Sequence, residues 1–213
     1  MGHWYCPRTK ERSTMPIPGW LPSVTTILAA TRPRQMREAI AAWQTKNPYN
    51  ATRELQVSSD RGTAVHDWMV GYLDRRIPPP SDRVIAPYCH RLQPLLDHLL
   101  ANCQLRSLGQ PLFHLDFAGE PDLIFWDRSR QGVVLMELKT RAKPMPAEKL
   151  HEAFLQATGY AEAYQFQLHE AINHLTIVVV QPKHQFMYHS TPELLLPQWR
   201  ARRIAYVSSQ ERN

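Results

Sequence analysis

The chain has 213 residues, enough for one substantial domain with its own hydrophobic core. Hydrophobic residues make up 43% of it and charged residues 21%, which excludes a disordered or fibrous chain. The net charge of +6, from 25 Lys and Arg against 19 Asp and Glu, favours an anionic partner such as nucleic acid. A basic protein without such a partner carries the same charge signature, so charge alone does not decide between the two.

The first half of the chain predicts mainly helices. Residues 1–22 are rich in Pro and Arg and are expected to wrap the surface, and residues 22–31, with their β-branched side chains, predict a short strand or a packed turn. Apolar residues at helical spacing predict three helices, which cover residues 32–47, 58–76 and 88–103. Ser59 or Asp60 is the expected N-cap of the second helix, and Pro94 marks a kink or the true start of the third.

The second half reads as a sheet with a helix crossing it. Segments rich in Val, Ile, Leu and Phe predict strands within residues 110–126, 132–140 and 174–182, with a short edge strand at 185–189. Helices are predicted at 147–168 and 192–210. The pattern indicates one mixed α/β domain over residues 1–213, with a mainly helical part at 1–106 and a sheet-bearing part at 107–213.

The cysteines and the apolar runs indicate the compartment. Cys6, Cys89 and Cys103 are widely spaced and form no CxxC pair, which is typical of reduced thiols inside a cell. No apolar run approaches the roughly 20 residues that a membrane-spanning helix needs, and the basic N-terminus lacks the apolar segment of a secretory signal. We therefore expect a cytoplasmic protein that does not engage a membrane, and an organelle matrix stays open.

The segment 119–140, GEPDLIFWDRSRQGVVLMELKT, places charged residues in two otherwise apolar strands. A buried charge without a partner is costly, so these residues need a counter-charge or a ligand. Residues two apart on a strand share a face, so Glu137 and Lys139 point the same way. The turn DRSRQG predicts an antiparallel hairpin, which brings Asp122 across from Glu137.

Two facing carboxylates repel each other, and a hard divalent cation relieves that repulsion. Oxygen ligands suit Mg²⁺ or Mn²⁺, so Asp122 and Glu137 predict a site for one or two such ions. Lys139 beside the cation can orient a water and stabilise charge on a phosphate oxygen. The alternative is an ordinary solvated Glu137–Lys139 ion pair, and the full spacing of G-x-P-D, turn and E-x-K favours the metal site.

This spacing resembles the signature of the PD-(D/E)xK nuclease superfamily. The segment GTAVHDWM resembles the helical histidine motif of the RecB-type exonuclease branch, and QATGYAEAY resembles the glutamine–tyrosine helix of that branch. PSVTTILAAT, LTIVVV and PQWRARRIAY are similar to segments of the group that contains the mitochondrial genome maintenance exonuclease and its bacterial and phage relatives. The resemblance runs from about residue 22 to residue 206. It implies a restriction-endonuclease-like αβββαβ core with an N-terminal helical extension, and a bacterial or phage origin.

The resemblance implies roles for individual residues. Asp122 and Glu137 match the metal-binding acids of the family, and the main-chain carbonyl of Leu138 completes the shell of the cation. Lys139 matches the catalytic lysine. His66 matches a histidine that reaches the metal from the helical part, and a histidine ligand favours Mn²⁺ over Mg²⁺.

Two further matches and one departure concern the substrate side of the site. Gln156 and Tyr160 match residues that lie beside the substrate and the catalytic lysine. Many relatives carry a glutamate ahead of G-x-P-D, where this chain offers Gln110, which makes one-metal chemistry more plausible. Asp116 or Glu120 are alternative sources of the missing charge.

Other cofactors are not expected. Three cysteines do not suffice for the four-cysteine iron–sulfur cluster of some RecB-type relatives. No HExxH or CxxC motif indicates zinc, and no GxxxxGK[ST] motif indicates a nucleotide cofactor or a motor.

Basic and aromatic residues elsewhere are candidates for contact with nucleic acid. Two arginine groups are possible phosphate contacts or solvated faces: Arg32, Arg34 and Arg37, and Arg200, Arg202 and Arg203. Trp43 and Trp68 are candidates for base stacking, but their apolar helical surroundings favour core packing for both.

The expected function is that of a metal-dependent DNA exonuclease acting on single-stranded ends. It would serve DNA repair or recombination, with a separate helicase or recombination protein as a possible partner. A structure- or sequence-specific endonuclease on the same core and a non-catalytic nucleic-acid-binding subunit are the alternatives. The oligomeric state, the polarity of digestion and the preference for DNA over RNA stay open.

Overall fold

The computed structural model describes residues 3–48 and 50–211. Its centre is a five-stranded sheet in the order β10-β9-β8-β7-β4. The strands are β4 (Cys103–Leu108), β7 (Leu123–Asp127), β8 (Gly132–Thr140), β9 (His174–Val180) and β10 (Gln185–Ser190). Only β8 and β9 run parallel, and the other neighbours are antiparallel, so the sheet is mixed. The mixed α/β class predicted from the sequence is confirmed.

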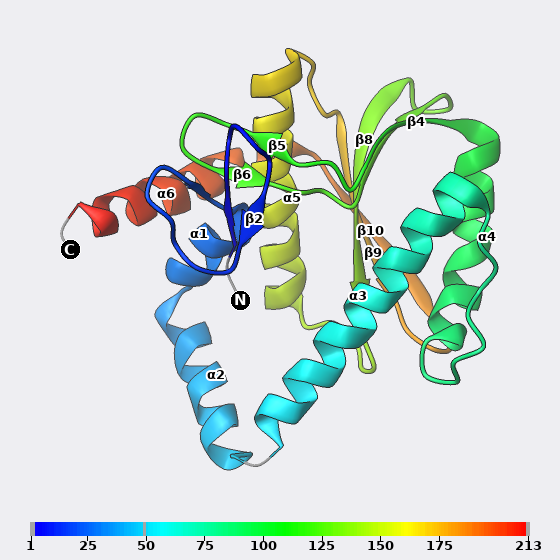
Figure 1. Ribbon diagram of the computed structural model, residues 1–213, viewed down its shortest axis with the longest axis horizontal. Helices are drawn as coiled ribbons and strands as arrows, with labels where there is room; N and C mark the ends of the chain where they lie inside the picture. Colours follow the sequence, from blue (N-terminus) through cyan, green and yellow to red (C-terminus); the bar gives the residue numbers. More distant parts are fainter. Residues whose placement is uncertain (1–2, 49, 212–213) are drawn as a thin grey trace.

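The described residues form the helices α1 (Val24–Ala30), α2 (Arg34–Lys46), α3 (Ala51–Arg75), α4 (Ala86–Asn102), α5 (Ala147–Leu168) and α6 (Pro192–Gln210). Helix α5 crosses one face of the sheet, with α1 and α6 packed behind it, and α3 and α4 lie on the other side (Figure 1). The helix α5 is the parallel crossover that joins β8 to β9.

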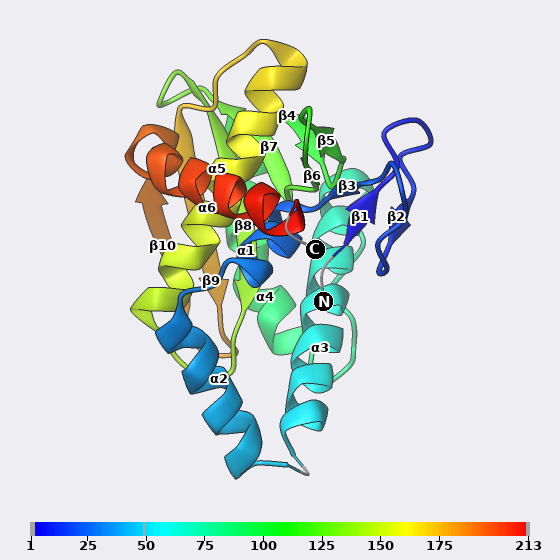
Figure 2. The ribbon, with the colours of Figure 1, turned by 90° about the vertical axis from the view of Figure 1, so that its left-hand side faces the viewer.

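Two small sheets complete the fold. Strands β1 (Trp4–Tyr5), β2 (Arg12–Ser13) and β3 (Leu21–Pro22) form an N-terminal sheet, and β5 (Leu112–Phe113) pairs with β6 (Ala118–Gly119). Figure 2 shows the N-terminal sheet projecting beside the upper part of α3, next to β5 and β6. The isolated bridge between Ser23 and Ala118 joins these two regions.

Side chains of β8 alternate between two hydrophobic cores. Val133 and Leu135 pack with α1, α5 and α6, whereas Val134, Met136 and Leu138 pack with α3 and α4. A strand buried on both faces explains the nearly continuous apolar run GVVLMELKT. Glu137 follows the parity of Val133 and Leu135, so its carboxylate lies on the α5 side of the sheet.

Several boundaries were predicted correctly and others were wrong. Helices α5 and α6 and the edge strand β10 lie where the sequence places them. Residues 24–30 form a helix instead of a strand or turn, because the Ser23 side chain caps it by accepting a hydrogen bond from the Thr26 N–H. Helix α3 begins at Ala51, so Ser59 and Asp60 lie inside it and do not cap it.

The third predicted helix needs two corrections. Pro94 lies inside α4, which begins at Ala86, so it does not mark the start of the helix. Strand β4 begins at Cys103 and pairs with β7. The sheet therefore starts before the boundary that we placed at residue 106, and the mainly helical part ends at Asn102.

Helices α2 and the first half of α3 extend beyond the sheet and approach each other at their far ends (Figure 1). No residue of α2 is buried, and Trp43 is only half-buried on its surface, so the expectation that Trp43 packs in the core is wrong. Trp68, on the second half of α3, is 7% exposed, so the expectation that Trp68 packs in the core is confirmed. Among the residues that the structure describes, no helix combines the length and apolar character needed to cross a bilayer.

Candidate active site

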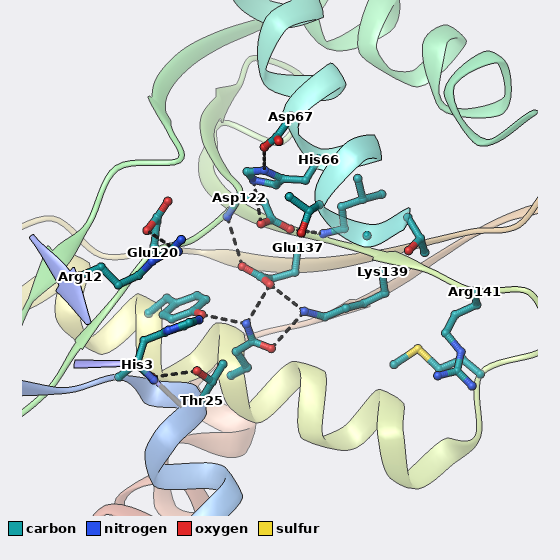
Figure 3. Close-up of a pocket in the computed structure, with 18 of the residues that line it drawn as sticks. His3, Arg12, Thr25, His66, Asp67, Glu120, Asp122, Glu137, Lys139 and Arg141 are labelled. Atoms are coloured by element: carbon teal, nitrogen blue, oxygen red, sulfur yellow. Dashed lines mark hydrogen bonds and ion pairs between the residues drawn. The ribbon is translucent and has the colours of Figure 1, made fainter. Parts of the chain in front are cut away.

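A cavity of about 590 Å³ opens where β7 begins, at the junction of β8, α3, α5 and the N-terminal sheet. Its wall includes all seven residues that the sequence singled out as a site: His66, Asp122, Glu137, Leu138, Lys139, Gln156 and Tyr160. These residues come from segments up to 94 positions apart (66 to 160), so their convergence is a property of the fold. Figure 3 shows Asp122, Glu137 and Lys139 side by side, with His66 approaching from the α3 side.

The two acids meet through the register of β7 and β8. Leu123 lies opposite Met136, which brings the preceding residue Asp122 beside Glu137. The Asp122 carboxylate accepts a hydrogen bond from the Leu138 N–H at 2.6 Å, and the Glu137 carboxylate accepts one from the Asp122 N–H at 3.2 Å. These main-chain donors hold both carboxylates at the end of the hairpin.

Lys139 lies in a network with the helix α5. Its Nζ donates to Glu137 Oε2 and to Gln156 Oε1, both at 3.0 Å. The Gln156 amide in turn donates to Glu137 Oε2 at 3.1 Å and to the Tyr160 hydroxyl at 2.8 Å. Gln156 therefore fixes the position of the lysine, and Tyr160 fixes that of the glutamine.

His66 approaches from the opposite side of the sheet, on α3. Its Nε2 lies 3.2 Å from Asp122 Oδ1, and its Nδ1 lies 3.6 Å from Asp67 Oδ1. The hydrogen bond to Asp122 is the main cause that raises the pKa of His66 to about 9, while burial opposes the shift. A protonated His66 thus places a positive charge against Asp122, and it would have to release a proton before the ring could ligate a cation.

Burial governs the charges of the other groups. It raises the pKa of Glu137 to about 7, the Asp122 charge adds to the shift, and Lys139 opposes it. Burial alone would lower the pKa of Lys139, but the Glu137 and Asp122 carboxylates raise it above its ordinary value. Burial also raises the pKa of Tyr160 well above its ordinary value, so this side chain stays a neutral phenol.

The donor set suits a hard divalent cation in its chemistry. Two carboxylates lie together with one of them, Glu137, only 1% exposed. The N–H and C=O of a strand residue point toward the same neighbouring strand. Because the Leu138 N–H donates to Asp122, the Leu138 carbonyl also points toward the end of β7 where Asp122 lies. Within residues 3–48 and 50–211, no three His, Cys, Asp or Glu side chains lie as close as in a ready-made metal centre. Glu137 Oε2 already accepts two hydrogen bonds, but Glu137 Oε1 and both Asp122 oxygens have one contact each, so a cation would be held through their remaining lone pairs.

The residues considered as the source of a further acid differ in whether they line the cavity. Gln110 is exposed, and its side-chain amide reaches only the Leu108 carbonyl at 3.5 Å, so it takes no part in the cavity. Asp116 is bound to His114 at 2.8 Å and to Arg203 at 3.4 Å, and it is absent from the cavity wall. Glu120 does line the cavity, as does Asp67, so of the two candidates Asp116 and Glu120 only Glu120 lies at the site.

The N-terminal residues of the cavity were missed by sequence reasoning. Tyr5 donates to Glu120 Oε2 at 3.2 Å, and Arg12 Nη1 lies 3.6 Å from the same oxygen. His3 also lines the cavity. These contacts join residues more than 100 positions apart, and no local pattern in the first 22 residues signals them.

Comparison with protein families gives no match for this sequence. No curated protein matches it either. Among solved structures, the chain is similar to SSO0001, whose crystal structure aligns with 88% of this chain and 75% of its own, at 12% identity and a TM-score of 0.46. A likeness at this level supports no statement about function.

Proposed function

We propose that this protein is a metal-dependent deoxyribonuclease that hydrolyses phosphodiester bonds from single-stranded DNA ends. The observation that carries the proposal is the convergence of Asp122, Glu137 and Lys139 in one cavity, with the lysine held by Gln156. The element order α4-β4-β7-β8-α5-β9 supports a restriction-endonuclease-like αβββαβ core and, with the motifs of the sequence, membership of the RecB-type branch.

A bound Mg²⁺ or Mn²⁺ supplies Lewis-acid stabilisation to the reacting phosphate. Asp122, Glu137 and the Leu138 carbonyl would hold that ion. Lys139, charged and held by Glu137 and Gln156, orients the attacking water and stabilises negative charge that develops on the phosphate oxygens. His66 orients Asp122, and Tyr160 orients Gln156.

The surroundings favour a nucleic-acid strand as substrate. The chain carries a net charge of +6, and Arg12, Lys139 and Arg141 line the cavity beside the acids. Single-stranded DNA follows from the family resemblance, which also implies a role in DNA repair or recombination in the cytoplasm of a bacterium or phage-infected cell. Unwinding of a duplex would require a separate helicase.

Digestion of labelled linear and circular single-stranded DNA tests the proposal. With Mn²⁺ or Mg²⁺ we expect loss of linear strands from an end, protection of a circular strand, and no hydrolysis in excess chelator. Lys139→Ala should slow the reaction by about 10³-fold. Cleavage of the circle would indicate the endonuclease alternative, and binding without any hydrolysis would indicate the non-catalytic alternative.

A further inference from the structure

Strand β8 and the residue that follows it present three charged side chains to the cavity. Glu137, Lys139 and Arg141 are spaced two residues apart, and side chains at this spacing point to the same face of a strand. The main chain is still paired with β9 at Arg141, because the Arg141 N–H donates to the Val180 carbonyl at 2.9 Å. All three residues line the cavity, and Figure 3 shows Arg141 beyond Lys139, on the side away from Asp122.

Arg141 differs in its partners from the other Arg and Lys side chains of the cavity wall. Lys139 contacts Glu137 at 3.0 Å, and Arg12 lies 3.6 Å from Glu120. Arg141 is half-buried, and within residues 3–48 and 50–211 its guanidinium forms no ion pair and no hydrogen bond. The charge of Arg141 is therefore available to an anion that enters the cavity.

The spacing along β8 fits the backbone of a single nucleic-acid strand. A strand rises by about 3.3 Å per residue, so Lys139 and Arg141 are separated by about 6.6 Å along β8. Successive phosphates of an extended single strand lie at a similar distance, because one sugar links them. A substrate whose scissile phosphate lies at Asp122 and Glu137, beside Lys139, would therefore bring a neighbouring phosphate to Arg141. The planar guanidinium of arginine suits a phosphate, since it can donate two parallel hydrogen bonds.

The arginine on the opposite side of the acids is already engaged. Figure 3 shows Arg12 and Arg141 on opposite sides of Asp122 and Glu137. The Glu120 carboxylate lies beside Arg12 and also accepts a hydrogen bond from the Tyr5 hydroxyl. A phosphate at Arg12 would meet the negative charge of Glu120, whereas a phosphate at Arg141 would not compete with an ion pair.

We propose that Arg141 binds the phosphate next to the scissile one in a single-stranded DNA substrate. The inference rests on the proposed function, because it takes the scissile phosphate to lie at Asp122 and Glu137. A contact with a phosphate that does not react is the same in the ground state and in the transition state, so Arg141 should act on KM and leave kcat unchanged.

Two short substrates test this assignment. A dinucleotide without terminal phosphates has one phosphodiester, whereas a trinucleotide has two, so that one of them has its neighbour on the Arg141 side. In Mn²⁺ we expect Arg141→Gln to lower kcat/KM on the trinucleotide by about 10-fold, through KM, because it loses a hydrogen bond between charged groups. The loss on the dinucleotide, which has no neighbouring phosphate, should be far smaller.

Two further variants serve as controls. Arg128 lies in the turn between β7 and β8, at the other end of the hairpin, and it is exposed and absent from the cavity wall. Arg128→Gln removes the same charge and should leave the kinetics on both substrates unchanged. Arg141→Lys keeps the charge but lacks the paired donors of the guanidinium, so we expect it to recover part of the loss. Circular dichroism should show the same fold for the three variants.

Binding without hydrolysis separates this contact from the reaction. A labelled single-stranded oligonucleotide is titrated with protein in excess chelator at several salt concentrations, and binding is read by fluorescence anisotropy. Arg141→Gln should reduce the slope of log K against log salt by about 0.7, which is the value for one phosphate contact with a single strand. Arg128→Gln should keep the wild-type slope.

The outcomes distinguish a wrong contact from a wrong reaction. An unchanged slope in Arg141→Gln, an equal loss in Arg128→Gln, no binding by the wild type, or an equal loss of kcat/KM on both short substrates overturns the assignment of Arg141. Any of these results together with hydrolysis by the wild type leaves the proposed function intact. A reduced slope in Arg141→Gln without hydrolysis by the wild type in Mn²⁺ would show that Arg141 contacts the strand and that the proposed reaction is wrong.

Discussion

The helix α5 carries two polar networks on opposite sides, and they differ in how their charges are balanced. Toward α6, Glu162 accepts hydrogen bonds from Trp199, Arg200 and Arg203 at 2.7–2.9 Å, so one carboxylate is fully engaged by donors of its own protein. Toward the cavity, Gln156 and Tyr160 contact a region where Asp122 and Glu137 face His66 and Lys139 across a space that is open to an external ion.

The difference separates stability from activity. A closed network of ion pairs and hydrogen bonds holds helices together, and the protein loses stability when one partner is removed. An open one lines a cavity that an external cation or substrate can enter, which is typical of a functional site. Substitutions in the network of Lys139 should therefore reduce activity, and substitutions in the network of Glu162 should reduce stability.

Lys139→Ala is the change with the largest expected effect. It removes the cation that contacts Glu137 and Gln156. Loss of one positioned electrostatic group costs about 10³-fold in rate, so kcat on a linear single strand should fall by about this factor. The Tm in saturating Mn²⁺ should stay close to that of the wild type, because the divalent ion would neutralise the acids. A variant with full activity would contradict the role of Lys139.

Glu162→Ala should act in the opposite way. It leaves the fully buried Trp199 without its acceptor and two arginines without their carboxylate. We expect the free energy of unfolding to fall by about 3 kcal/mol, measured by urea denaturation. Glu162→Gln keeps an acceptor for the indole and should lose less. A loss of activity in Glu162→Ala at a temperature where the variant is folded would contradict the assignment of the Glu162 network to stability alone.

Gly119→Ala tests how tightly the cavity network is packed. A Cβ at this position would lie 2.2 Å from Tyr160 Cε1, which no real contact allows. The buried ring must then shift, and with it Gln156, which holds Lys139. Since a displacement of about 1 Å can cost about 10²-fold in rate, we expect a loss of that size in kcat/KM. Wild-type kinetics in this variant would show that Tyr160 does not position the site.

Gly159→Ala is the matched change on the other side of α5 and has the smallest effect. The added Cβ would lie 2.9 Å from Val24 Cγ1 and 3.0 Å from Trp199 Cζ2, between α1 and α6. Overpacking costs about 1–3 kcal/mol, and the better helix propensity of Ala offsets about 1 kcal/mol. We expect a net destabilisation of about 1 kcal/mol by thermal unfolding, with unchanged kcat/KM for the folded protein.

The sheet and its crossover helix were readable from the sequence because strong apolar periodicity fixes them. Helix α5 at 147–168 and the pairing of Asp122 with Glu137 follow from local pattern and from the turn between β7 and β8. The α1 segment was misread because its β-branched residues favour a strand. Ser23 caps the helix instead, and its hydroxyl also accepts a hydrogen bond from the distant His3 N–H.

The remainder of the site depends on contacts that no local pattern encodes. Asp116 and Glu120 were both candidates for a further acid, and only the folded chain shows that Glu120 lines the cavity, where it contacts Tyr5 and Arg12. His3, Tyr5 and Arg12 lie in a segment with the composition of a surface loop, yet all three line the cavity. The half-buried Trp43 was misjudged because helical spacing alone does not reveal whether a second element covers the stripe.

Direct measurement of cation binding tests the central claim. Mn²⁺ is titrated into wild type, Asp122→Asn and Glu137→Gln, and the free ion is followed by electron paramagnetic resonance. We predict saturable binding of Mn²⁺ by the wild type, competed by Mg²⁺, and a loss of affinity in each variant while circular dichroism shows an intact fold. Equal affinity for Mn²⁺ in all three proteins would contradict a metal site at these two acids, and with it the proposed hydrolysis.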